Sequence, residues 1–230
     1  MDALFAPLEV GTADQPFVIA QLGQSLDGRI ATLSGDSKYI NGASALDHLH
    51  WLRAEVDAVI VGVGTVVADD PLLTVRRVKG CSPARVVIDP SGRVPVQARC
   101  LRDDGAQRIV VTREETKAPE VFDVLRLPSN GRSLCPRTIV AALGQRGFRR
   151  LLIEGGARTI SSFIDAGCVH RLHVLIAPLI LGSGKSALDL KPIDALSEAL
   201  RPLARAHVLS DGNVLFDCSL RQPGSEATGL

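Results

Sequence analysis

Short runs of Val, Ile and Leu alternate with segments of helical spacing along most of the chain. The apolar runs predict buried strands, and the periodic segments between them predict helices. Strands are expected at residues 17–22, 59–61, 85–88, 109–112 and 151–153, and helices at 44–54, 136–146 and 158–166. Ser44 is placed to act as the N-cap of the first helix. Repeated strand-helix-strand units predict an α/β fold, with a mostly parallel central sheet and helices on both faces.

The pattern changes after the last of these helices. Further strands are expected at residues 169–177, 207–209 and 214–219, and the sequence SDGN at 210–213 is a strong hairpin turn. The sheet is therefore expected to close with antiparallel strands at its carboxy-terminal end. A chain of 230 residues with 46% hydrophobic and 22% charged residues predicts one domain. Its core is expected at about 17–219, with a loose tail at 223–230.

Composition argues against several classes of partner. The 26 basic residues balance 25 acidic ones, and the eight aromatic residues are too few and scattered to stack nucleic-acid bases. The longest apolar runs fall short of the ~20 residues that a membrane helix needs. The first residues have neither a basic start nor a sustained apolar segment, so no secretion signal is expected. These features predict a cytoplasmic protein that binds neither nucleic acid nor membrane.

The cysteines and histidines do not predict a metal site. Five cysteines stand far apart and form no CxxC pair, which argues against a disulfide framework and a structural zinc. The histidine pairs His48/His50 and His170/His173 have no acidic or cysteine partner at ligand spacing. We expect these histidines to be surface or packing residues.

Two glycine-rich segments match phosphate-binding motifs only in part. The sequence GSGKS at 182–186 ends like a P-loop, but Leu179 stands where the motif needs its first glycine. The sequence GVG at 62–64 follows a predicted strand, but Val67 replaces the third glycine of a dinucleotide fingerprint. Pro71 then restricts Asp70, so only a short helical turn can follow the strand.

A third segment, LLIEGGARTI at 151–160, runs from a buried strand into a helix through Gly155 and Gly156. Free amides at such a helix start bind anions, and Arg158 and Thr159 add a charge and a hydroxyl. Glu154 at the strand end is either a salt-bridge partner or an acceptor for the amide edge of a ligand. Because ligands of parallel sheets bind beyond the carboxyl ends of the strands, a dinucleotide spanning both turns is the simplest interpretation.

Several motifs taken together resemble one known family. They occur in the family's order as QSLDGRIA (24–31), GDS (35–37), LR (52–53), GVGTVVADDPLLTVR (62–76), VID (87–89), RVP (93–95), EGG (154–156) and IAPLILG (176–182). The family is the reductase domain of bacterial and archaeal riboflavin biosynthesis, whose fold is that of dihydrofolate reductase. The similarity spans residues 17–219.

The resemblance implies an activity and a set of site residues. Members reduce the ribosyl group of 5-amino-6-(5-phosphoribosylamino)uracil to a ribityl group with NADPH, and they tend to form homodimers. The implied cofactor contacts are Gly23, Tyr39, Gly62, Thr65, Asp69, Gly156, Ala157, Arg158, Thr159, Ile160, Ser161 and Ser162. The implied substrate contacts are Ser37, Arg53, Leu73, Arg76 and Glu154. Asp27 and Glu154 are the candidates for orienting or protonating the substrate.

Simpler explanations exist for some of these residues. Arg53 lies at a helix carboxyl end, where a cation is stabilising in any protein, and Arg76 belongs to a loop that can be merely solvated. Asp27 and Gly28 form an ordinary turn pair. In the family a Thr often stands where this chain has Arg158, which leaves single phosphate contacts open. Arg93 is a further candidate for a 2′-phosphate.

Two other functions remain open at this point. One is a reductase of the same fold that acts on another pyrimidine or a pteridine such as dihydrofolate. The other is a nucleotide-binding protein without catalysis. Neither the HxE nor the PCxxC signature of the deaminase found in many relatives occurs in the chain, so the resemblance implies a reductase domain alone.

Overall fold

A nine-stranded sheet forms the centre of the computed structural model, which describes residues 8–38, 40–119, 121–131 and 133–220. The strand order is β12-β13-β10-β1-β9-β3-β4-β5-β6, and the strands from β10 to β6 are parallel. The bounds are β1 Phe17–Ser25, β3 Ala58–Gly62, β4 Ala84–Ile88, β5 Arg108–Arg113, β6 Asp123–Leu127, β9 Arg150–Glu154, β10 Arg171–Ala177, β12 Leu203–Val208 and β13 Val214–Ser219. The predicted tail at 223–230 lies outside the described residues.

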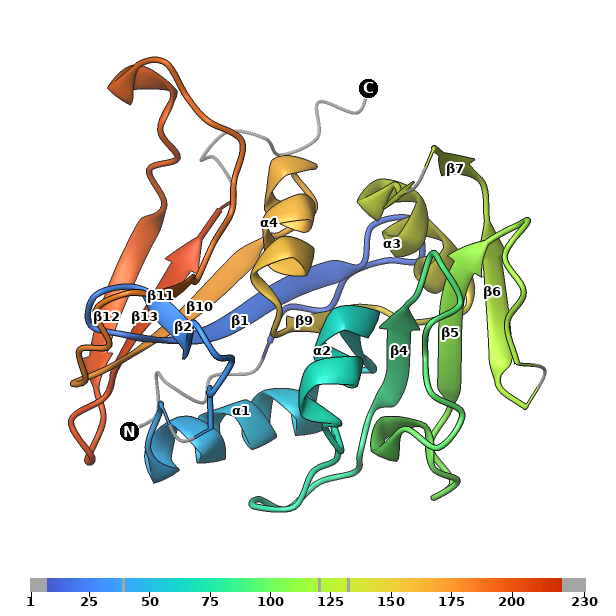
Figure 1. Cartoon of the computed structure of the whole chain (residues 1–230), viewed down its shortest axis with the longest axis horizontal. Coiled ribbons are helices and arrows are strands. Elements are labelled where there is room, and N and C mark those ends of the chain that lie inside the picture. Colours follow the sequence, from blue (N-terminus) through green and yellow to red (C-terminus); the bar gives the residue numbers. More distant parts are fainter. Residues whose placement is uncertain (1–7, 39, 120, 132, 221–230) are drawn as a thin grey trace.

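Each face of the sheet has its own apolar core. Side chains of a strand alternate between the faces, so Val18 and Ala20 of β1 pack with α3 and α4, whereas Phe17 and Ile19 pack with α1. The helices are α1 Ala43–Glu55, α2 Val63–Asp69, α3 Pro136–Gln145 and α4 Ala157–Asp165, with short 3₁₀ turns η1 Arg99–Leu101 and η2 Leu196–Glu198. Figure 1 shows α3 and α4 on one side of the sheet and α1 on the other. The predicted mostly parallel sheet with helices on both faces is confirmed.

The start of α1 differs from the prediction. The helix begins at Ala43 with Gly42 as N-cap, so Ser44 is not the cap. Instead the carboxylate Oδ2 of Asp211 accepts the backbone N–H of Ser44 at 2.9 Å. The predicted hairpin turn between β12 and β13 therefore satisfies the helix end from 167 residues away in sequence. Such a contact cannot be inferred from local spacing.

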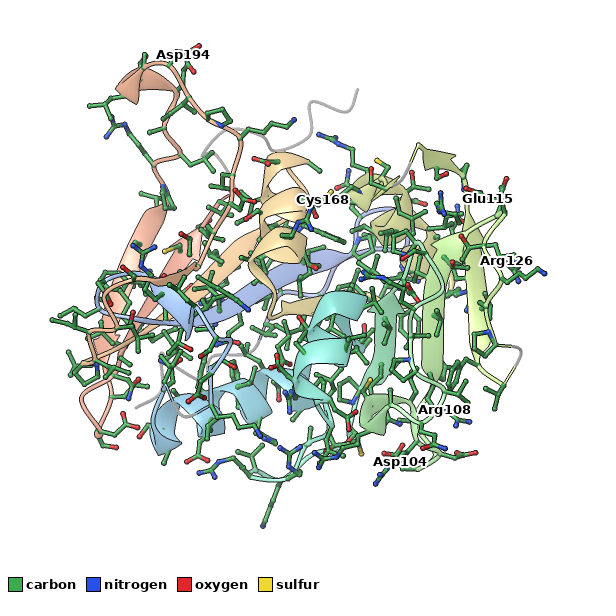
Figure 2. All side chains as sticks on the ribbon, viewed as in Figure 1. Asp104, Arg108, Glu115, Arg126, Cys168 and Asp194 are labelled. Carbon is green, nitrogen blue, oxygen red and sulfur yellow. The ribbon has the colours of Figure 1, made fainter. Side chains whose placement is uncertain are left out.

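Several short elements were not predicted. The strand β2 Arg29–Thr32 pairs with β11 Gly184–Ser186, and β7 Ser129–Asn130 pairs with β8 Ser133–Leu134. The GSGKS sequence thus supplies a strand and not a P-loop, because the next helical element is the short turn η2. The segment between β11 and β12, which includes Asp194, projects from the body of the molecule (Figures 1 and 2).

Two further expectations concern the role of the histidines and the length of the apolar helices. His48 of α1 and His173 of β10 are buried, and their ring nitrogens lie 3.0 Å apart, so they are packing residues. Among the described residues no three His, Cys, Asp or Glu side chains lie together as metal ligands would. In the same part of the chain, no helix is both long and apolar enough to span a bilayer.

Candidate active site

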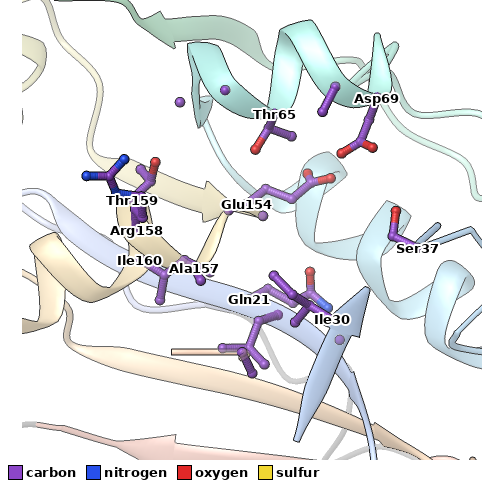
Figure 3. A pocket seen from close by; sticks show the side chains of 18 of the residues that line it. Gln21, Ile30, Ser37, Thr65, Asp69, Glu154, Ala157, Arg158, Thr159 and Ile160 are labelled. Atoms are coloured by element: carbon purple, nitrogen blue, oxygen red, sulfur yellow. The ribbon is translucent and has the colours of Figure 1, made fainter. Parts of the chain in front are cut away.

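A cleft of about 1110 Å³ opens at the carboxyl ends of the parallel strands β1, β9, β3 and β4. The turns into α2 and α4 form its floor, while α1 and the β2–β11 pair line it at one end. The loop after β4 and the start of α3 line it at the other end. In Figure 3, Glu154 lies between Thr65 and Asp69 of α2 and Gln21 of β1. Sheets of this class bind ligands at this edge.

The two glycine turns lie against each other in the floor of the cleft. A Cβ atom on Gly62 would lie 2.5 Å from Oγ1 of Thr159, which belongs to the other turn. A Cβ on Gly156 would lie 2.9 Å from Oγ1 of Thr65, which belongs to the first turn. Each glycine thus lets a threonine of the opposite turn approach the backbone. The two glycine turns indicated by the sequence are therefore neighbours in the structure.

The start of α4 has the geometry of an anion site. Gly156 is its N-cap, with φ of +76°, and the helix continues through Ala157 and Arg158. The first amides of a helix have no acceptor within that helix, and the helix dipole favours negative charge there. Arg158 is exposed and Thr159 half-buried, and both line the cleft. A phosphate group fits these donors.

Glu154 is held by a buried guanidinium fork from α1, behind the cleft lining. Arg53 of α1 donates Nε–H to Oε2 at 2.8 Å and Nη2–H to Oε1, and its Nη1 donates to the carbonyl of Thr74 at 3.0 Å. Arg53 is 5% exposed and does not line the cleft. An ion-paired carboxylate keeps further lone pairs for ligand donors. Of the alternatives for Glu154, the structure shows the salt bridge, with the carboxylate still facing the cleft.

The loop after α2 brings Arg76 to the cleft. His50 of α1 accepts the backbone N–H of Arg76 through Nδ1 at 2.9 Å, and Arg76 Nη1 donates to Oγ1 of Thr74 at 3.0 Å. Burial, with the charges of Arg53, Arg76 and Arg77 nearby, lowers the pKa of His50 to about 4. His50 is therefore neutral at physiological pH, as an acceptor must be.

The cleft includes most of the predicted site residues. Those that line it are Gly23, Ser37, Gly62, Thr65, Asp69, Arg76, Glu154, Gly156, Ala157, Arg158, Thr159, Ile160 and Ser162. Those outside its lining are Asp27, Arg53, Leu73 and Ser161. Tyr39 lies outside the described residues.

The residues outside the lining have other contacts. The carboxylate of Asp27 accepts Ser25 Oγ–H at 2.6 Å and the N–H groups of Leu181 and Gly182 at 3.1 and 2.7 Å. These donors, Ser25 first, lower the pKa of Asp27 to about 2, so it has no proton to give near neutral pH. Leu73 is buried in the α1-side core, and Ser161 Oγ accepts the N–H of Asp189.

Several polar residues of the cleft were not predicted. Gln21 is 5% exposed, and Asn41 and Lys185 line the cleft near the β2–β11 pair. Ser91 lines it after β4. Gln21 had a signal in the sequence, because it interrupts the apolar run of residues 17–22 just before the strand end. The signal for Lys185 was the partial P-loop sequence GSGKS, which did not reveal that its short strand pairs with one 154 positions earlier, Lys185 facing Ala31.

The fold places the protein in a broad structural class. Dihydrofolate reductase from Enterococcus faecalis superposes with a TM-score of 0.51 at 10% identity, covering 92% of this chain and 98% of that one. The predicted dihydrofolate-reductase-like fold is thereby confirmed.

Sequence comparison defines the family within that class. Residues 16–215 match the model of the RibD C-terminal domain. The 2,5-diamino-6-ribosylamino-4(3H)-pyrimidinone 5′-phosphate reductase of Methanothermobacter thermautotrophicus is 36% identical, over 86% of this chain and 95% of that protein. The chain belongs to the RibD C-terminal domain family, as the motif resemblance implied.

Other relatives are longer than this chain. The crystal structure of a diaminohydroxyphosphoribosylaminopyrimidine deaminase/5-amino-6-(5-phosphoribosylamino)uracil reductase from Thermotoga maritima has a TM-score of 0.75 at 29% identity. The match covers 89% of this chain and 56% of that chain. The chain spans a similar share, 54%, of the riboflavin biosynthesis protein RibD of Aquifex aeolicus.

Proposed function

We propose that the chain reduces the ribosyl group of a 5-amino-6-(5-phosphoribosylamino)pyrimidinone to a ribityl group with NADPH. One observation supports this most: the same cleft joins the two glycine turns, which suit cofactor phosphates, to Glu154 and Arg76, which suit a phosphorylated pyrimidine. The names of the relatives from Methanothermobacter and Thermotoga describe reductases of such compounds.

The cofactor phosphates fit the floor of the cleft. The amides at the start of α4, with Arg158, Thr159 and Ser162 beside them, would hold the pyrophosphate. Thr65 would approach it from the turn into α2. When bound, the reduced nicotinamide supplies a hydride to the substrate.

The side chains of the loop after β4 favour NADPH over NADH. Asp89 is fully buried, and its carboxylate accepts the N–H groups of Ser91 and Val94 at 3.4 and 2.7 Å. This loop places Ser91 and Arg93 on the cleft, with Arg93 Nε–H donated to Ser91 Oγ at 3.0 Å. A guanidinium beside a hydroxyl suits a 2′-phosphate. Replacing Arg93 by Ala is expected to raise the KM for NADPH and leave that for NADH unchanged.

The substrate would lie at the α1 end of the cleft. Glu154 accepts donors from the pyrimidine edge, and Arg76 and Ser37 suit the 5′-phosphate. Arg53, which was expected to contact the substrate directly, would act through Glu154, because it lies outside the cleft lining and its guanidinium already donates to Glu154 and to the Thr74 carbonyl. Leu73 likewise supports the loop from the core.

The reduction balances with one hydride and one proton. In the ring-opened substrate the bond between C1 of the ribose and the nitrogen is an imine. The hydride adds to C1, and the nitrogen gains a proton to give the ribitylamine and oxidised cofactor. Asp27 lies outside the cleft lining and Glu154 is ion-paired, so we assign this proton to water.

Oxidation of NADPH on addition of the aminouracil phosphoribosyl substrate tests the proposal. The variant Arg76→Ala is expected to raise the KM for the substrate at least tenfold, because a charged hydrogen bond to phosphate is lost. The neighbouring Arg77 pairs with Asp47 at 2.6 Å and does not line the cleft, so Arg77→Ala is the matched control. Turnover of dihydrofolate but not the aminouracil would favour the pteridine alternative, and turnover of neither would favour a non-catalytic protein.

We also propose a homodimer formed through the β12 edge of the sheet. No strand covers the outer side of β12 among the described residues, and such edges readily pair with another chain. Large apolar side chains there and on the projecting segment are exposed, among them Ile193, Leu196, Leu200, Leu203 and Val208. Sedimentation of the wild type and of Leu203→Glu distinguishes a dimer from a monomer. The cytoplasmic location stays a prediction of the sequence.

A further inference from the structure

Two polar contacts attach α1 to the sheet along one register row. Arg53 donates to Glu154 of β9. His48 lies five positions earlier on α1, and its Nε2 is 3.0 Å from Nδ1 of His173 on β10. His173 and Glu154 are both register partners of Gln21 on β1, so the two side chains leave the sheet on the same face. One helix is therefore held at two points across three neighbouring strands.

His48 and His173, the histidine pair, form a directional hydrogen bond. Both rings are buried, and burial lowers the pKa of His48 to about 3 and that of His173 below its ordinary value. Both are therefore neutral near neutral pH, and a neutral imidazole has one donor and one acceptor nitrogen. Oδ1 of Asp217 lies 3.4 Å from Nε2 of His173, and it accepts Nε–H of Arg171 at 2.6 Å. The carboxylate places the proton on Nε2, so Nδ1 of His173 accepts and Nε2–H of His48 donates.

The same helix carries two side chains that build the substrate end of the cleft. His50 accepts the backbone N–H of Arg76, and Arg53 holds Glu154. The histidine pair does not line the cleft, so it can affect the cleft only through α1. Sliding or rotation of α1 would break the bond between the two rings and leave a buried polar atom unpaired, which is unfavourable. The bond thus resists movements that would displace His50 and Arg53 together.

We propose that His48 and His173 are positioning residues for the reduction: their hydrogen bond sets the place of α1 and, through Arg53, the direction of the Glu154 carboxylate that receives the pyrimidine. The inference rests on the proposed function, which supplies the ligand. The histidine pair touches neither substrate nor cofactor, so a change in it should act on binding of the pyrimidine. The proposed site of the cofactor phosphates is the start of α4, which this bond does not hold, so binding of NADPH should be unchanged.

Steady-state kinetics of His48→Leu tests the proposal, with the aminouracil phosphoribosyl substrate and NADPH varied in turn. The KM for the pyrimidine is expected to rise about tenfold, because a small displacement of α1 misplaces Glu154. The kcat and the KM for NADPH are expected to stay within about twofold, since Glu154 holds a part of the substrate that does not react. An unchanged KM for the pyrimidine would overturn the proposal.

A conservative variant tests the hydrogen bond itself. His48→Gln keeps an N–H near the position of Nε2, so its KM for the pyrimidine is expected within about threefold of the wild type. A KM as high as that of His48→Leu would show that the bond does not matter. His170→Leu is the matched control, because His170 accepts the N–H of Val18 at 3.0 Å and does not line the cleft. A raised KM in this control would mean that the loss of any buried hydrogen bond has the same effect.

A double variant separates positioning from stability. His48→Leu alone leaves Nδ1 of His173 without its donor, whereas His48→Leu/His173→Leu removes both polar partners and should recover part of the lost stability. The KM for the pyrimidine is expected to stay raised in the double variant. If KM and stability recover together, packing alone places α1 and the proposal is wrong.

A measurement without substrate distinguishes failure of this inference from failure of the proposed function. Urea midpoints are compared for the wild type, His48→Leu, Arg53→Met and their double variant. The loss in the double variant is expected to be smaller than the sum of the single losses, because the second contact is already weakened when the first is gone. Additive losses would show that the two contacts do not place α1 together. If the wild type does not turn over the pyrimidine while the losses are non-additive, the proposed function is wrong and the placement of α1 stands.

Discussion

The two glycine turns in the floor of the cleft are built for different reasons. Gly62 has φ of −79°, which any residue adopts, and its lack of a side chain matters because Thr159 lies close. Gly155 and Gly156 have φ of +65° and +76°, a region that side chains disfavour. Gly62 therefore leaves room for the Thr159 side chain, whereas Gly155 and Gly156 allow the backbone to adopt the positive φ angles that lead into α4.

The turns also differ in the elements that flank them. The first leads into α2, which ends after seven residues at Asp70, in the left-handed region with φ of +40°. The second comes directly after Glu154, which is anchored by the buried Arg53 of α1, and opens the longer α4. We therefore propose the second turn as the phosphate site, with the first turn as its partner.

The largest effect is expected where the second turn is anchored. Arg53→Met leaves the buried Glu154 carboxylate without its partner, and breaking such a pair costs about 3–5 kcal/mol of stability. The double variant Arg53→Met/Glu154→Gln removes both charges and should recover part of the loss. Urea unfolding of the wild type, Arg53→Met, Glu154→Gln and the double variant measures this, and additive losses would show that the pair is not coupled.

Gly156→Ala is the next largest change. The new side chain must adopt φ of +76°, which costs about 1–3 kcal/mol. Adding Thr65→Ala removes the nearby hydroxyl but not the backbone strain, so the double variant should stay destabilised. Thermal unfolding of the single and double variants distinguishes strain from a simple clash.

Gly62→Ala should behave in the opposite way. Its backbone tolerates any residue, and the one close neighbour among the described residues is Oγ1 of Thr159, whose displacement costs about 0.5–1.5 kcal/mol. Thr159→Ala removes that atom, so the double variant should be no less stable than Thr159→Ala alone. Persistent destabilisation of the double variant would mean that the two turns are alike after all.

The effect that is smallest at neutral pH concerns the loop after the first turn, and it grows as the pH falls. The pKa of His50 is about 4 in the folded protein, below the ordinary value of 6.5, because of burial and nearby arginines. The unfolded chain therefore binds more protons in this range, and stability is lost as pH falls from 6.5 toward 4. His50→Gln keeps an acceptor for Arg76 without titrating. Unfolding free energies across this range should fall less steeply for the variant than for the wild type.

The sequence alone predicted most of the parallel strands of the central sheet. Unbroken runs of Val, Ile and Leu marked β3, β4, β5 and β9, and the glycines marked where two of them end. It was insufficient for β2 and β11, which are short and partly polar and exist because they pair with each other. Local pattern holds no information on such a pairing.

The same limit applies to the site. The motif resemblance indicated Arg53 and Glu154 separately as substrate contacts. The hydrogen bonds between them join positions 101 residues apart, so our proposal that Arg53 acts through Glu154 required the structure. Asp27 was indicated by a recognisable motif as a group that could orient or protonate the substrate. The motif did not reveal that its carboxylate accepts hydrogen bonds from Ser25, Leu181 and Gly182.

A crystal structure of the protein with NADPH would decide whether both glycine turns hold one cofactor in one cleft. We predict the pyrophosphate at the start of α4, with Gly156 and Thr159 on one side and Thr65 on the other. We further predict the 2′-phosphate at Arg93 and the nicotinamide on the side of Gln21 and Glu154. A pyrophosphate bound instead at the Gly182–Ser186 segment, or a cofactor that leaves either glycine turn untouched, would contradict this arrangement.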